Sequence, residues 1–82
     1  MSFGLLILRN ATQQLATLPS EAYTDAVQRI HQLAIDPLPP SAERVAGREG
    51  WRLRVGDYRV IYEVDMPAAR VTILDVARRS DV

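Results

Sequence analysis

The chain has 82 residues, which is enough for one domain and too few for a second hydrophobic core. An apolar content of 48% excludes an intrinsically disordered chain, and the absence of cysteine excludes disulfides and thiolate-bound zinc. Ten basic residues balance ten acidic ones, so the total charge does not indicate a nucleic-acid partner. No segment approaches the roughly 20 apolar residues that span a bilayer, so we expect a cytoplasmic protein with no membrane partner.

The N-terminal half predicts one strand and two helices. The apolar run 3–8 (FGLLIL) is typical of a buried strand. Asn10 is the expected N-cap of a short helix that Pro19 stops, and Ser20 is the expected cap of a longer helix reaching about Ile35. The short Leu-Pro-Ser connection makes the two helices an antiparallel hairpin. The second helix has apolar residues at spacings of three and four, namely Tyr23, Ala26, Val27, Ile30, Leu33 and Ala34.

The C-terminal half predicts three strands, at about 51–55, 58–64 and 70–76. Residues 36–50 hold three of the five prolines and two of the four glycines, so we interpret them as a connection. Residues 65–69 are the expected turn between the last two strands. The order strand, helix, helix, strand, strand, strand predicts a single α+β domain over residues 1–82. Its sheet is small and mostly antiparallel, with the helical hairpin packed on one face.

The hairpin within residues 51–64 (WRLRVGDYRVIYEV) has a register set by Gly56-Asp57, a pair suited to a two-residue turn with glycine first. Alternation then divides the side chains between two faces. The apolar face pairs Val55 with Tyr58, Leu53 with Val60 and Trp51 with Tyr62, and includes Val64. The other face carries Arg52, Arg54, Arg59, Ile61 and Glu63, with Arg54 directly across from Arg59.

Like charges directly opposite on a sheet are destabilising, so this arginine cluster requires a partner. One possibility is that Glu63, Glu49 and nearby acids neutralise it on a solvated face. The other is that the cluster binds phosphate, because several guanidinium groups together stabilise the charge that develops in phosphoryl transfer. Arg78-Arg79, just past the last strand, would close such a site from one side.

The arginine composition favours the second possibility without deciding it. All ten basic residues are arginine, and eight of them lie between Arg44 and Arg79. Arginine-favouring codon usage is the alternative explanation for the absence of lysine. The uneven distribution nevertheless makes the C-terminal half the expected contact surface for an anion.

The runs RLRVGDYRVIYEVD and VTILDVARRSDV resemble the RelE/ParE toxin superfamily of bacterial toxin–antitoxin systems. The whole chain matches the layout of that superfamily, and VAG at 45–47 is similar to its Leu-x-Gly before the sheet. The resemblance to the RelE branch implies an endoribonuclease that cuts messenger RNA in the ribosomal A site, with no cofactor or metal. The ribose 2′-hydroxyl attacks its own phosphate and leaves a 2′,3′-cyclic end.

The resemblance also implies roles for individual arginines. Arg52 and Arg54 would contact RNA phosphates, and Arg59 would stabilise the scissile phosphate. Arg79 would act at the leaving group or on the transition state, with Arg78 binding phosphate beside it. The expected partners are a RelB-like cognate antitoxin, the ribosome and messenger RNA.

The acid and the base of such a reaction are poorly supplied. His31 falls on the polar side of the second helix, Tyr62 points to the apolar face and Tyr58 flanks the turn, so all three are interpreted as structural or surface residues. Glu63 is a candidate base, although an ion-pair role fits it better. Many active RelE-type toxins have a tyrosine directly after the segment matching 80–82.

Because this sequence stops at Val82, other interpretations than a fully active nuclease stay open. One is an inactive or attenuated RelE-like enzyme. The other is a ParE-like inhibitor of DNA gyrase that acts by binding alone. A non-toxic binding module, whose arginines serve only an acidic partner, is the third interpretation.

Overall fold

The computed structural model describes residues 2–47 and 49–78. Its elements are β1 (Gly4–Ile7), α1 (Arg9–Ala16), α2 (Ser20–Leu33), β2 (Glu43–Arg44), β3 (Trp51–Val55), β4 (Tyr58–Asp65) and β5 (Arg70–Arg78). The strands form one sheet in the order β1-β5-β4-β3-β2, in which β1 runs parallel to β5 and the other neighbours are antiparallel. The predicted α+β architecture is confirmed.

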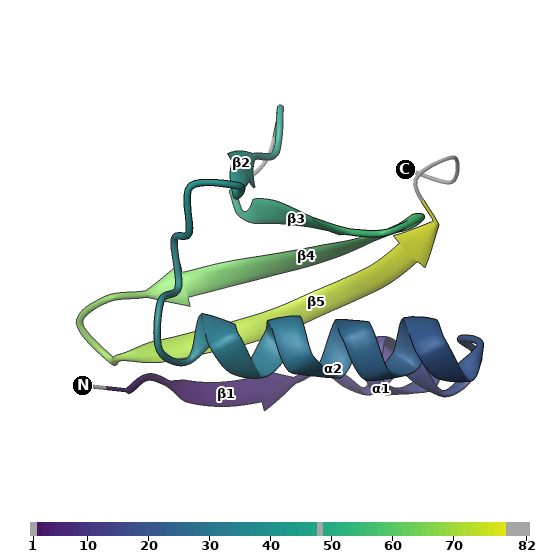
Figure 1. Ribbon diagram of the computed structural model, residues 1–82. Coiled ribbons are helices and arrows are strands. Elements are labelled where there is room, and N and C mark those ends of the chain that lie inside the picture. The colour runs from purple at the N-terminus through teal and green to yellow at the C-terminus, as the bar shows by residue number, and fades with distance from the viewer. Residues whose placement is uncertain (1, 48, 79–82) are drawn as a thin grey trace.

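The helical pair covers only part of the sheet. In Figure 1, α1 and α2 lie over the side of the sheet formed by β1 and β5, whereas β2 and β3 project at the opposite side. The core lies between the helices and the strands and is built from Ala11, Leu15, Ala26, Ile30, Leu33, Leu53, Val55, Val60, Tyr62, Val71, Ile73 and Val76. Of the stripe expected on α2, Tyr23 is 46% exposed, so that part of the prediction is wrong. No helix in the described ranges is long and apolar enough to cross a bilayer.

The helix starts differ from the expected caps. Leu8 precedes α1 and Pro19 precedes α2, and neither side chain caps the helix. Asn10 lies inside α1 and donates from Nδ2 to the carbonyl oxygen of Leu74 at 2.7 Å. The reason is tertiary: β1 ends at Ile7, so α1 runs beside a stretch of β5 that has no strand on its β1 side, and side-chain amides satisfy its backbone groups there.

The connection contains a strand that the sequence did not predict. Glu43 and Arg44 pair with Arg52 and Trp51, which adds β2 to the free side of β3. The backbone N–H of Val45 then donates to the carbonyl of Gly50 at 3.1 Å and closes the loop. Gly50 has φ +126°, and a Cβ there would lie 3.2 Å from the Tyr62 carbonyl oxygen, so this close approach requires glycine.

A bulge separates two halves of the β4–β5 ladder. Ile61 pairs with Asp75 but Tyr62 pairs with Ile73, which leaves Leu74 as the extra residue of β5. Strict alternation along β5 would place Ile73 and Asp75 on the same face. The bulge instead lets Ile73 point into the core while Asp75 lies on the opposite face, beside Ile61.

Tyr62 is a structural tyrosine, as predicted. Its side chain is fully buried, and its hydroxyl donates to the carbonyl oxygen of Pro37 at 2.8 Å. Burial, with a smaller contribution from the negative charge of Asp36, raises the pKa of Tyr62 from 10.0 to about 12. The protonated phenol of Tyr62 therefore links the start of the connection, at Pro37, to the core through this hydrogen bond.

We expect alkaline pH to weaken this attachment. Because the folded pKa of Tyr62 lies above the unfolded value, its contribution to stability is complete below pH 10 and is lost as the pH rises toward 12. Tyr62→Phe should cost about 1 kcal/mol at neutral pH through the lost hydrogen bond. Between pH 10 and 12 the variant should lose stability less steeply than the wild type, as measured by urea unfolding at several pH values. Parallel pH profiles for the two proteins would contradict this role.

Candidate functional site

The arginine face is the side of the β3–β4 hairpin that points away from the helices, and it comprises Arg52, Arg54, Arg59, Ile61 and Glu63. The predicted register is confirmed at every pair, including Arg54 directly opposite Arg59. Gly56 has φ +59° and Asp57 does not have a positive φ, which is the pattern of the glycine-first turn that sets this register. Two guanidinium groups therefore share one stretch of sheet surface.

One ion pair relieves part of the repulsion. The carboxylate of Glu43 in β2 lies 3.2 Å from Nη2 of Arg52, and it neutralises the arginine nearest the sheet edge. Sequence reasoning named Glu63 and Glu49 for this task, but neither forms an ion pair with a described residue. The sequence does not indicate Glu43, because its position opposite Arg52 depends on β2. That strand has only two residues and therefore no hydrophobic periodicity.

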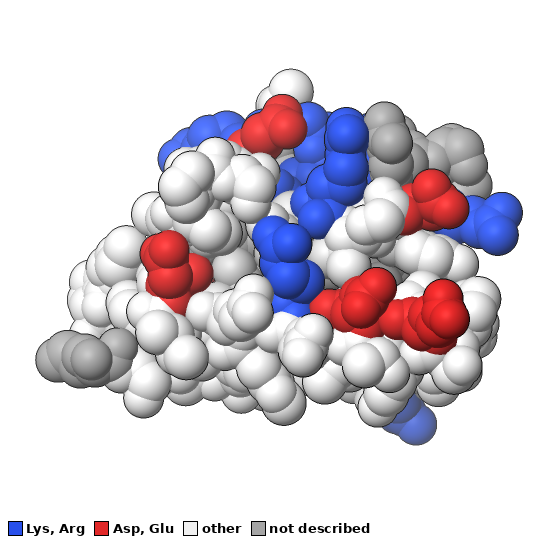
Figure 2. All heavy atoms as spheres, viewed as in Figure 1, with Lys and Arg blue, Asp and Glu red and all other residues white. Residues whose placement is uncertain are grey.

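Arg54 keeps its charge available. Its side chain is exposed, and among residues 2–47 and 49–78 it has no hydrogen-bond or ion-pair partner. Arg59 is half-buried and engaged in an interaction of its own. Arg44, by contrast, stacks its guanidinium 5.2 Å from the centre of the Trp51 ring, on the opposite side of the sheet. In the view of Figure 2, basic side chains form a row that rises from the helical layer toward the end where β2 and β3 project.

The floor of the arginine face is apolar. Ile61 is only 3% exposed although it lies on this outer face, and Val45, just after β2, lines the same hollow. Beside these two residues is a hollow of about 830 Å³ that reaches around the end of β5 to the turn between the helices. Its lining consists of Gln14, Thr17, Leu18, Pro19, Val45, Tyr58, Ile61, Asp75, Val76, Ala77 and Arg78.

A polar network fixes one wall of this hollow. Gln14 donates from Nε2 to Oδ1 of Asp75 at 3.0 Å and accepts from the backbone N–H of Val76 at 2.8 Å. Asn10 donates to the same carboxylate oxygen at 3.4 Å. Asp75 thus accepts hydrogen bonds from neutral amides of α1 and lies opposite Ile61, next to the arginine face.

The terminal arginine pair is described only in part. Arg78, the last residue of β5, pairs with Tyr58, whereas Ala77 pairs with Arg59. Alternation therefore places Arg78 on the Tyr58 side of the sheet, where it lines the large hollow and approaches the arginine face only around the end of β5. Arg79 lies outside the described residues. His31 is exposed in the last turn of α2, away from this site.

The arrangement is chemically an anion-binding surface. It combines an exposed guanidinium, a second guanidinium directly opposite and a hollow that can accept a group attached to the bound anion. Guanidinium forks bind phosphate oxygens in bidentate fashion, and an apolar floor strengthens such contacts by lowering the local dielectric.

Comparison with known proteins supports the fold described above. Residues 5–82 match the family model described as the ParE toxin of the type II toxin–antitoxin system parDE. A chain of the archaeal RelE–RelB complex from Pyrococcus horikoshii superimposes with a TM-score of 0.84 at 26% identity over 100% of both chains. A chain of a RelBE toxin–antitoxin complex from Mycobacterium tuberculosis gives 0.79 at 26% identity, over 96% of this chain and 100% of that one. The isolated RelE toxin of Escherichia coli gives 0.75 at 18% identity, over 94% and 84%, which shows the shared fold. No curated protein matches the sequence.

Proposed function

Since this chain belongs to the ParE toxin family of type II toxin–antitoxin systems, within the RelE/ParE superfamily, we propose that it acts as a RelE-like messenger RNA endoribonuclease on the ribosome. Ribosomes and messenger RNA would then be its targets, in the cytoplasm. The observation that carries the proposal is the pair Arg54 and Arg59, directly opposite each other on a sheet face that neither α1 nor α2 covers. A surface that holds two like charges together is stabilised when an anion binds between them.

The residues divide the work as follows. Arg52 and Arg54 hold phosphates of the RNA strand, and Arg59 stabilises the scissile phosphate as negative charge builds up on it. In the free protein the carboxylate of Glu43 neutralises Arg52. In the complex Arg52 would release this carboxylate and bind a phosphate in its place. Arg78 binds phosphate from the end of β5, and Arg79, the next residue in the sequence, would act at the leaving group.

General acid–base catalysis is the weaker half of this site. Tyr62 is buried with a raised pKa, and His31 is remote, so neither is placed to move a proton at the arginine face. Glu63 is exposed on that face and remains the candidate base. An enzyme built in this way depends on the ribosome to align the 2′-hydroxyl with its phosphate, because positioning alone supplies much of the rate enhancement.

Primer extension on translating ribosomes tests the proposal. The purified chain should produce cuts within the codon in the A site, and it should leave the same RNA intact in the absence of ribosomes. An absence of cuts on ribosomes, both for this sequence and for a version extended by a C-terminal tyrosine, would refute the nuclease.

The alternative function is inhibition of DNA gyrase by binding without catalysis, as implied by the ParE branch that gives the matched family its name. A supercoiling assay with purified gyrase separates the two. Inhibition of supercoiling together with intact messenger RNA would favour the gyrase inhibitor.

Either toxin would be held inactive by a cognate antitoxin. Support comes from the solved relatives, since those from Pyrococcus horikoshii and Mycobacterium tuberculosis are complexes of RelE with RelB and of a toxin with its antitoxin. We therefore expect a small antitoxin gene next to the gene for this chain, with a RelB-like product.

A further inference from the structure

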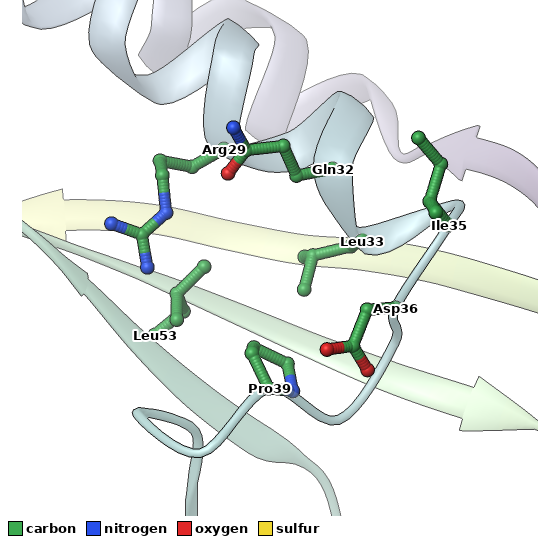
Figure 3. A pocket seen from close by; sticks show the side chains of 7 residues that line it. All are labelled: Arg29, Gln32, Leu33, Ile35, Asp36, Pro39 and Leu53. Carbon is green, nitrogen blue, oxygen red and sulfur yellow. The ribbon is translucent and has the colours of Figure 1, made fainter.

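A second hollow lies on the helical side of the molecule, between α2, β3 and the segment that follows α2. Its volume is about 280 Å³, and it is lined by Arg29, Gln32, Leu33, Ile35, Asp36, Pro39 and Leu53. Figure 3 shows Leu33 of α2 and Leu53 of β3 pointing into it, with Pro39 on the side of the connection. Leu33 and Leu53 are each only 1% exposed, so they form the buried floor of the hollow, and the other lining residues form its rim.

The hollow is suited to a side chain of another protein. Its volume lies just below the roughly 300–1,000 Å³ of typical small-molecule pockets. Ile35, on its rim, is 73% exposed, and Leu38 in the same segment is 37% exposed. Exposed apolar residues at or near a hollow with an apolar floor are typical of a protein–protein contact.

The charges at the two ends of the hollow define what the partner must carry. In Figure 3 the guanidinium of Arg29 lies on the Leu53 side and the carboxylate of Asp36 on the Pro39 side. Arg29 donates a hydrogen bond to Oγ of Ser41 at 3.4 Å and has no acidic partner among the described residues. An acidic group of the partner, next to its bound apolar side chain, would form an ion pair with Arg29. Complementary charges of this kind are common at the rims of interfaces.

We propose that this hollow is an anchor site for the antitoxin, which seats one large apolar side chain over Leu33 and Leu53 and places a carboxylate on Arg29. The proposal rests on the toxin–antitoxin pairing proposed above and adds to it the surface and the chemistry of recognition. An amphipathic segment with an apolar residue next to an acidic one fits both features.

The position of the anchor has a consequence for regulation. Leu53 points into the hollow, whereas its neighbours Arg52 and Arg54 point to the opposite side of β3. An antitoxin anchored in the hollow therefore contacts β3, the strand that carries Arg52 and Arg54, on the side opposite to the arginine face. The anchor does not include the arginine face. Substitutions in the hollow can therefore change the affinity for the antitoxin while Arg54 and Arg59 stay unchanged.

Two substitutions with matched controls test the anchor. The probe is the product of the antitoxin gene adjacent to the gene for this chain, titrated into the purified chain by calorimetry. Gln32→Trp places a large ring at the hollow, and Gln28→Trp places the same ring on an exposed position of α2 one turn earlier, outside it. Arg29→Glu reverses the charge at the hollow, and Arg9→Glu makes the same change at the exposed start of α1.

We expect Gln32→Trp and Arg29→Glu each to weaken binding by roughly tenfold or more, and both controls to stay within about twofold of the wild type. Wild-type affinity in both hollow variants would overturn the anchor site while leaving the toxin–antitoxin pairing intact. Failure of the wild-type chain to bind the antitoxin would instead overturn the pairing, and the anchor with it. If sedimentation showed a dimer of the chain alone that Gln32→Trp dissociates, the hollow would belong to a second copy and the anchor would be wrong.

Discussion

Replacing Arg59 by alanine is expected to lower ribosome-dependent cleavage at least about 100-fold, the effect typical of removing one group that stabilises transition-state charge. Arg59 lies directly opposite Arg54 on the face of the hairpin that points away from the helices, where a phosphate bound between them would contact both side chains. The measurement is the single-turnover rate of messenger RNA cleavage on programmed ribosomes. Because the reaction develops charge on the phosphate, the loss should appear in the rate constant at saturating toxin as well as in binding.

Arg70→Ala is the matched control for this substitution. Arg70 is an exposed arginine of the same sheet at the start of β5, the end remote from the Gly56-Asp57 turn. The control should cleave at the wild-type rate, since it changes the net charge equally without touching the arginine face. Equal losses in the two variants would show that the total charge matters and that the arrangement at the hairpin does not.

Replacing Leu53 by alanine is expected to destabilise the protein by about 2–4 kcal/mol. Leu53 is 1% exposed and belongs to the core cluster between α2 and the sheet, where it pairs across the hairpin with Val60. Truncation removes its burial and enlarges the adjoining hollow, which the rigid strand pair cannot collapse to fill. For a domain of this size, with a total stability on the order of 5–15 kcal/mol, that loss is a large fraction. Urea unfolding followed through Trp51 fluorescence measures it.

Leu6→Ala provides the matched control, because Leu6 is a leucine of the same sheet that is 46% exposed. It should change the free energy of unfolding by no more than about 0.5 kcal/mol. Arg59→Ala should also lower the melting temperature less than Leu53→Ala does. If Arg59→Ala proved the more destabilising of the two, the division of the hairpin into a core face and an arginine face would be wrong.

The hairpin could be predicted from the sequence because its determinants are local. Gly56 adopts the positive φ that a glycine-first turn requires, and the period of two in each flanking run then assigns every side chain to a face. A slip of one residue would have exposed Leu53 and buried Arg54, at a cost too high for any other contact to offset. The arginine face follows directly from this register.

Other parts of the site could not be predicted because they depend on contacts between distant segments. Asn10 looks like an N-cap but bonds to Leu74, 64 residues away, because α1 runs along the free edge of β5. The bulge at Leu74 places Asp75 beside Ile61, although strict alternation along β5 would put it on the core side. The pairing of Glu43 with Arg52 requires a strand of only two residues, which has no periodicity to detect.

The α+β architecture and the two faces of the β3–β4 hairpin follow from the amino-acid pattern, because hydrophobic periodicity and turn chemistry act over a few neighbouring residues. The arrangement of charge and space around that hairpin follows from tertiary contacts. The carboxylate that neutralises Arg52, the position of Asp75 and the hollow beside Leu53 all depend on how segments far apart in the chain pack together. Packing between distant segments depends on how many side chains fit together at once, so it cannot be inferred from any short stretch of sequence.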